Sequence, residues 1–312
     1  MVKLAQHPLL PIMEGRFFVS WVLAFAALLS GRTLLGRSLD FRGPAELRRI
    51  LLMRGALYWL LVATMWGAVR CIPIGNVTAA ANASPLLTAS LAKLLLREGL
   101  SRFFVKAGVL SMLGIGCLAV STSGHHGSPS SDLDAVDEDF GWLLFAVAFL
   151  TMSVLPLTIR ISREAHWLEV EHVNAAVAAL VLTPAAVACT HVFQVRSEHA
   201  MMLMVSPRDA LLLGGMSFVA LCLQTRGFQL ADASIAAMMW YVQVPFSYVL
   251  QWYVFGDPPS LVAAFGALCL LLAAVLNAMG ARPMMSQGRY NAMTSDADNN
   301  AECELLATQD TS

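Results

Sequence analysis

The stretch PPSLVAAFGALCLLLAAVLNAMGA, from Pro258 to Ala281, decides the class of fold. It contains no Asp, Glu, Lys or Arg, and a helix that crosses a bilayer core needs about 20 consecutive apolar residues. The whole chain of 312 residues has the same character, because 57% of it is hydrophobic, 13% is charged and its mean hydropathy is +0.65. Soluble domains carry about 25% charged residues. We therefore predict an all-α, multi-pass membrane protein and exclude a disordered chain, a collagen-like repeat and a nucleic-acid-binding surface.

Eight further stretches of the chain are free of charged residues. Each one is apolar enough for a transmembrane helix, and the shorter ones can extend past a flanking Arg whose side chain reaches the headgroups. With Pro258–Ala281 they predict nine transmembrane helices, the other eight being Phe17–Gly31, Gly55–Val69, Cys71–Ala92, Ala107–Ser131, Phe140–Ile159, His172–Val195, Ala210–Thr225 and Ala233–Gly256.

The placement of basic residues predicts the orientation of these helices. Nine helices put the two ends of the chain on opposite sides, and 15 of the 20 Lys and Arg residues, Arg54 included, then fall on the side of the carboxyl end. Cytosolic connections carry the excess of Lys and Arg, so we expect a cytosolic carboxyl terminus. The acidic segment 123–139 has no basic residue and is expected to be a non-cytosolic loop, and the polar tail 282–312 a disordered cytosolic segment.

The segments on either side of this acidic loop, 1–122 and 140–281, resemble weak repeats. At an offset of 156 residues four pairs match in identity or type: Arg70 with Arg226, Asn76 with Asp232, Thr78 with Ser234, and Ala80 with Ala236. Each copy continues into an apolar helix that contains a proline, Pro85 or Pro245. Copies joined by an odd number of helices lie inverted in the membrane, and inverted repeats build transporters with a site at the repeat interface.

These residues resemble those of the EamA branch of the drug/metabolite transporter superfamily, and most closely the G subgroup of solute carrier family thirty-five. The resemblance covers about residues 9–280 and rests on seven motifs in order: EGRFF (14–18), RGAL (54–57), IPIGNVTAA (72–80), SPL (84–86), REGL (97–100), QLADASIA (229–236) and FGD (255–257). It implies ten helices in two inverted five-helix halves with both ends cytosolic. The first helix of that fold has no counterpart here. We therefore expect either an amino-terminally truncated chain, as from an incomplete gene model, or a true nine-helix protein.

Polar groups inside predicted spans are the candidate solute-binding residues, since a polar side chain in lipid is costly unless it faces protein or water. They lie on the third span (Thr78, Asn82) and on the eighth (Ser234, Tyr241, Gln243, Tyr248), two helices that the resemblance places around a central cavity. Helix packing is the alternative role for each of them.

Three arginines near span ends are further candidates: Arg16, Arg70 and Arg226. An arginine beside a low-dielectric cavity can bind a carboxylate bidentately, which predicts a preference for anionic or zwitterionic solutes. The alternative is that all three only reach the headgroups and anchor their helices.

Function follows from what the chain contains and lacks. It has no nucleotide-binding glycine pattern, no catalytic constellation and no metal-ligand spacing, so we expect neither an enzyme nor a cofactor or metal. We predict a transporter of a small organic solute that works by alternating access in the plasma membrane or an endomembrane. The alternatives are an endomembrane carrier of organic anions or nucleotide sugars and a non-transporting membrane scaffold. Small residues on the fourth and ninth spans predict close helix packing and leave a homodimer open.

Overall fold

The computed structural model describes residues 9–34, 39–72, 74–97, 100–123, 135–192, 207–256 and 259–280. All regular secondary structure in these ranges is helical. The first helices are α1 (Leu9–Leu34), α2 (Arg48–Cys71), α3 (Ile74–Ala81), α4 (Ser84–Leu95), α5 (Phe104–Ser123) and α6 (Ala135–Ile161). They are followed by α7 (Trp167–Ala176), the π-helical segment η2 (Val177–Leu182), α8 (Thr183–Val192), α9 (Pro207–Leu230), α10 (Ala233–Met238), the 3-10 segment η4 (Met239–Val242), α11 (Gln243–Phe255) and α12 (Leu261–Met279).

Eight helical stretches in the described ranges are long and apolar enough to cross a membrane: Met13–Thr33, Arg48–Cys71, Phe104–Ser121, Asp139–Ile161, Trp167–Cys189, Ala210–Leu230, Ala233–Val254 and Leu261–Met279. They correspond to eight of the nine predicted spans. The third predicted span, Cys71–Ala92, differs because it is divided into α3 and α4, neither of which is long enough alone. The division falls at Asn82, just ahead of Pro85, whose missing N–H cannot continue the ladder of helix hydrogen bonds.

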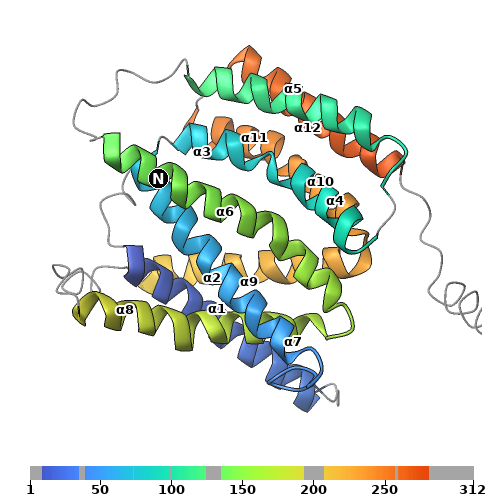
Figure 1. Cartoon of the computed structure of the whole chain (residues 1–312). Helices are drawn as coiled ribbons and strands as arrows, with labels where there is room; N and C mark the ends of the chain where they lie inside the picture. Colours follow the sequence, from blue (N-terminus) through green and yellow to red (C-terminus); the bar gives the residue numbers. More distant parts are fainter. Residues whose placement is uncertain are drawn as a thin grey trace, which may run out of the picture.

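The two parts of the chain on either side of residues 124–134 interleave rather than form separate bodies. Figure 1 shows α5 and α12 along one edge of the bundle, α3, α4, α10 and α11 next to them, and α1, α7 and α8 toward the other edge. Four pairs carry much of the packing: α2 with α6, α5 with α12, α1 with α9, and α4 with α10. Each pair joins an early helix to a late one, so the middle of the bundle is lined by both parts.

Small residues bring α5 and α12 into close contact, as the sequence predicted. A Cβ atom on Gly114 would lie 2.8 Å from the backbone oxygen of Gly266, and one on Gly266 would lie 2.9 Å from the oxygen of Gly114. Ala263, Ala267 and Ala274 are buried in the same interface. These small residues therefore pack α5 against α12 within the chain. Lipid supplies no hydrophobic driving force between helices, so such contacts depend on dispersion attraction.

This contact makes a matched pair of substitutions informative. We expect Gly114→Ala to destabilise the protein by about 1–3 kcal/mol, because the new methyl group meets backbone atoms that cannot turn away. Gly116, two residues further along α5, has nothing within 4 Å of such a methyl group. Gly116→Ala should therefore be neutral or stabilising through helix propensity. Thermal unfolding in detergent measures both, and equal effects would contradict the packing of α5 on α12.

Three sequence predictions need correction or lie outside the described ranges. Arg54 was predicted in a connection, but it lies inside α2 with a side chain only 1% exposed. The acidic loop was predicted to reach residue 139, but α6 already begins at Ala135, where acidic residues favour a helix start. The remainder of that loop, residues 1–8 and the tail 282–312 are outside the described residues.

Candidate functional site

Two interrupted helices meet inside the bundle. The break between α3 and α4 lies ahead of Pro85, and the 3-10 segment η4 lies ahead of Pro245, near the start of α11. A proline cannot donate to the carbonyl four residues earlier, which explains why both helices lose regular α geometry on that side. Because α4 packs on α10, the two irregular helices are neighbours. In membrane transporters such paired interruptions mark the solute site.

A cavity of about 310 Å³ lies next to η4, and five elements contribute its walls. Its lining residues are Tyr58 and Leu61 from α2, Met152 and Leu155 from α6, Ala220 and Gln224 from α9, and Trp240 and Gln243 from η4 and α11. The volume matches the lower end of small-molecule sites, and the lining combines apolar side chains with one phenol and two amides. No side chain in this lining is charged, so any charge that attracts a solute must act from behind the wall.

A proline in α6 frees a backbone carbonyl at one of the lining residues. Pro156 lies inside α6, four residues after Met152, and has no N–H to donate to the Met152 carbonyl. Met152 is one of the lining residues. A backbone carbonyl released by proline within a membrane helix is available to a solute, a water molecule or a neighbouring side chain.

Arg16 lies directly behind the phenol of the cavity wall. Its Nη2 donates to the Tyr58 hydroxyl at 2.6 Å and its Nε donates to Ser217 Oγ of α9 at 2.8 Å. The guanidinium also faces the rings of Phe17, Tyr58 and Trp66 at 5.7–5.9 Å from their centroids. Cation–π contacts and two hydrogen bonds stabilise this charge inside the bundle. A positive charge thus lies one side chain away from the cavity.

A second and more deeply buried arginine, Arg54, lies one helical turn before Tyr58 and forms an ion pair. Arg54 Nη2 is 2.7 Å from Glu171 Oε1 of α7, and the two side chains are 1% and 2% exposed. Thr225 of α9 accepts from Arg54 Nη2 at 2.9 Å and donates to Glu171 Oε1, and Asn174 Nδ2 donates to Glu171 Oε2 at 3.3 Å. This Arg54 cluster, made of Arg54, Glu171, Asn174 and Thr225, connects α2, α7 and α9. Charged groups at such a depth in a membrane bundle mark functional sites by default.

A second ion pair fixes the start of the interrupted helix α10. Arg160, in the last turn of α6, donates to Asp232 Oδ1 at 3.1 Å and to the Gln229 carbonyl at 3.2 Å. Asp232 is the residue that precedes α10. The pair therefore ties the end of α6 to the turn between α9 and α10, and it keeps the η4 wall of the cavity in place.

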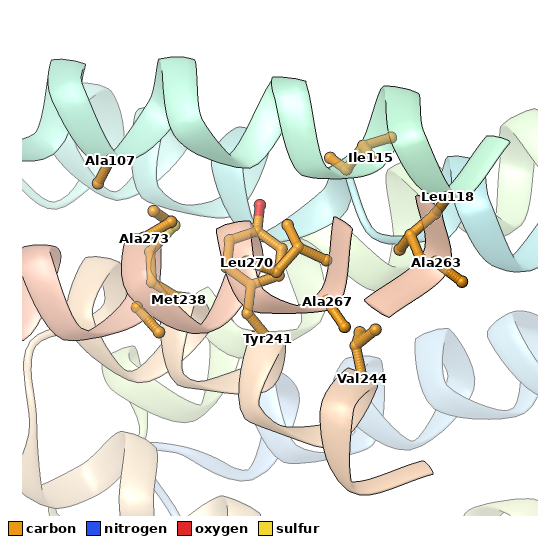
Figure 2. Close-up of a cluster of buried hydrophobic side chains, with 11 residues drawn as sticks. Ala107, Ile115, Leu118, Met238, Tyr241, Val244, Ala263, Ala267, Leu270 and Ala273 are labelled. Atoms are coloured by element: carbon orange, nitrogen blue, oxygen red, sulfur yellow. The ribbon is translucent and has the colours of Figure 1, made fainter. Parts of the chain in front are cut away.

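The predicted candidates divide into three groups by position. Gln243 lines the cavity and Arg16 lies behind it, whereas Arg70 and Arg226 are exposed and outside its lining. Tyr241 and Tyr248 belong to the buried cluster between α5, α12 and α11, and Figure 2 shows the Tyr241 ring passing Leu270 with its hydroxyl toward α5. The remaining three candidates, Thr78, Asn82 and Ser234, are outside the cavity lining. Thr78 is exposed on α3, and its carbonyl accepts a hydrogen bond from Asn82 Nδ2. The Ser234 carbonyl accepts a hydrogen bond from Asn277 Nδ2.

Sequence reasoning missed both the rest of the cavity lining and the Arg54 cluster. Arg54 and Glu171 fall outside the predicted spans, because a span defined as free of charge ends at the nearest charged residue. The signal that could have found them is a single charge followed by a long apolar run, as in Arg54 before Gly55–Val69 and Glu171 before His172–Val195. A lone charge of that kind can be buried against a partner of opposite sign on another helix.

Comparisons with known proteins support the fold and leave the function open. No protein-family model and no curated protein matches the chain. Solved structures do match it, and one of them, described only as "Crystal structure of protein", superposes with a TM-score of 0.64. That match has 17% sequence identity and covers 89% of this chain and 90% of the other. An identity this low shows a shared fold alone.

Proposed function

We propose that this chain is a transmembrane transporter that moves a small organic solute by alternating access, as a member of the EamA branch of drug/metabolite transporters. The observation that carries the proposal is the cavity beside the proline-interrupted helix η4–α11, with walls from residues both before and after the 124–134 segment. A site between two halves can be exposed to either side when the halves rock against one another. The motifs of the resemblance and the matched residue pairs of the sequence support the inverted-repeat architecture.

Charge near the cavity favours an anionic or zwitterionic solute. Arg16 donates a hydrogen bond to the hydroxyl of Tyr58, and Tyr58 lines the cavity. A multiply charged nucleotide sugar is a weaker candidate, since the described lining contains no Lys or Arg to bind a diphosphate directly. The second charge nearby, Arg54, is neutralised by Glu171.

Solute flux tests the proposal. Small carboxylates, amino acids and neutral sugars are screened by the melting temperature of the purified protein, because a ligand of the folded state raises apparent stability. Radiolabelled forms of the stabilising compounds are then offered to proteoliposomes with and without the protein. We expect protein-dependent, saturable uptake that is trans-stimulated by the same unlabelled solute. Stabilisation without uptake would contradict transport and favour a non-transporting scaffold of the same fold.

The proposed orientation has its own test. We expect an epitope tag inserted at Gly127 to be non-cytosolic and a tag at the carboxyl end to be cytosolic. The sequence places 15 of the 20 basic residues on the side of the carboxyl end. The position of Arg54 inside α2 takes only one residue from those 15, so the excess of positive charge on that side remains. Antibody binding before and after selective permeabilisation measures this. Equal access to both tags in intact membranes would contradict the assignment.

A further inference from the structure

The Arg54 cluster adjoins the cavity through two of its own helices. Tyr58 lines the cavity four residues after Arg54 on α2, and residues four apart lie on one helix face. On α9, Gln224 lines the cavity and Thr225 follows it directly. In this conformation the cavity stops at Tyr58 and Gln224, so the charged groups lie immediately behind its wall.

The hydrogen bonds of Arg54 are incomplete. Its Nη2 donates to Glu171 and Thr225, but its Nε and Nη1 are buried without an acceptor among the described residues, as is Asn174 Oδ1 without a donor. A guanidinium has five N–H donors, and each buried donor left unpaired costs free energy. A pair with a purely structural role would satisfy these donors with carbonyls or carboxylates. The unmet donors of Arg54 therefore point to an acceptor that arrives from elsewhere.

The cluster also lies across the moving parts of the proposed transporter. Arg54 belongs to the part before residue 124, whereas Glu171, Asn174 and Thr225 belong to the part after residue 134. The two parts are in tight contact here, since a Cβ atom on Gly55 would lie 2.8 Å from Val177 Cβ. Separation of α2 from α7 and α9 would pull Glu171 away from Arg54 and connect Arg54 to the cavity.

We propose that Arg54 binds the anionic group of the solute, a carboxylate or a phosphate, and that the Glu171 carboxylate occupies Arg54 in the conformation described here. This inference rests on the proposed transport function and names its substrate class. When α2 moves away from α7, the solute anion replaces Glu171 as the partner of Arg54. The exchange keeps the arginine paired in both conformations, which avoids the cost of an isolated charge in the bundle.

Anion rescue of a Glu171 variant tests the exchange in the purified full-length chain. The probes are sodium succinate and sodium phosphate, each compared with sodium chloride at equal ionic strength. We expect Glu171→Gln to have a lower melting temperature than the original protein, and succinate or phosphate to raise it by about 2–4 °C more than chloride does. The probe with the larger shift identifies the anion class. The original protein should respond less, because Glu171 competes for Arg54.

Three further variants keep the test decisive. Arg54→Gln combined with Glu171→Gln removes both charges and should lose the anion-specific shift. Arg226→Gln removes an exposed arginine from α9 and should leave the response of the original protein unchanged. Thr225→Val keeps both charges but removes the hydroxyl that bonds to each of them, so it should show a smaller shift in the same direction and serves if Glu171→Gln does not fold.

The outcomes separate this inference from the proposed function. If neither Glu171→Gln nor Thr225→Val responds to succinate or phosphate more than to chloride, Arg54 is not an anion site and the inference is wrong. It is equally wrong if the doubly substituted protein keeps the anion-specific shift. Flux into proteoliposomes is measured independently, so uptake without anion rescue overturns only the role of Arg54, and rescue without uptake overturns only transport.

Discussion

Replacement of Arg54 by Met should destabilise the protein by about 3–5 kcal/mol, the cost of leaving one member of a buried ion pair without its partner. Glu171 would keep the hydrogen bonds from Thr225 and Asn174 but would lose the opposite charge 2.7 Å away. Neither water nor lipid can replace that charge at a position 2% exposed. Chemical or thermal unfolding in detergent measures the loss.

The second substitution in the same pair supplies the control. Combining Arg54→Met with Glu171→Leu removes both charges, and apolar replacement of a whole buried pair is often neutral or stabilising. We therefore expect the double variant to recover most of the stability lost by Arg54→Met alone. Arg226→Met, at an exposed arginine of α9, should change stability by less than about 0.5 kcal/mol. Additive losses in the double variant would show that the two side chains act independently.

The fold was predictable from the sequence to the extent that charge and length determine it. Uninterrupted apolar runs such as Pro258–Ala281 can be satisfied in lipid only as helices, and eight of the nine predicted runs are helices long enough to span. The exception contains Pro85, and composition alone does not say whether a proline bends a helix or divides it. In this structure the division coincides with Asn82, whose side-chain amide donates to the Thr78 carbonyl at the end of α3.

The site was less predictable, because the sequence shows which residues are polar but not which way they point. Tyr241 and Gln243 are two residues apart, yet Tyr241 is fully buried toward α5 and Gln243 lines the cavity. Side chains two residues apart point to opposite faces of a helix, and the packing of η4 against α12 decides which of the two faces is buried. Partners far apart in the sequence, such as Arg54 with Glu171, depend on which helices pack together. A single sequence carries no direct signal for that pairing.

The cavity wall is uncharged, but charged side chains lie directly behind it. In the proposed transporter, apolar side chains and the amides of Gln224 and Gln243 would let a solute enter and leave without a strong bond in the wall itself. Arg16 stands behind Tyr58 and provides an attractive field in a low-dielectric surrounding, whereas Arg54, one helical turn before Tyr58, is paired with Glu171. Arg16 is held by hydrogen bonds to Tyr58 and Ser217, so its field exists before the solute arrives.

A bulky side chain in the cavity should stop transport without unfolding the protein. Ala220 of α9 lines the cavity, and an indole in its place would occupy much of a volume of about 310 Å³. We expect Ala220→Trp to lower solute uptake into proteoliposomes at least about tenfold, because a site that is already filled cannot bind. Val219, its neighbour on α9, is 56% exposed and outside the lining, so Val219→Trp should keep both uptake and melting temperature. If Ala220→Trp transports as well as Val219→Trp while both stay folded, the solute takes another route and this cavity is not the transport site.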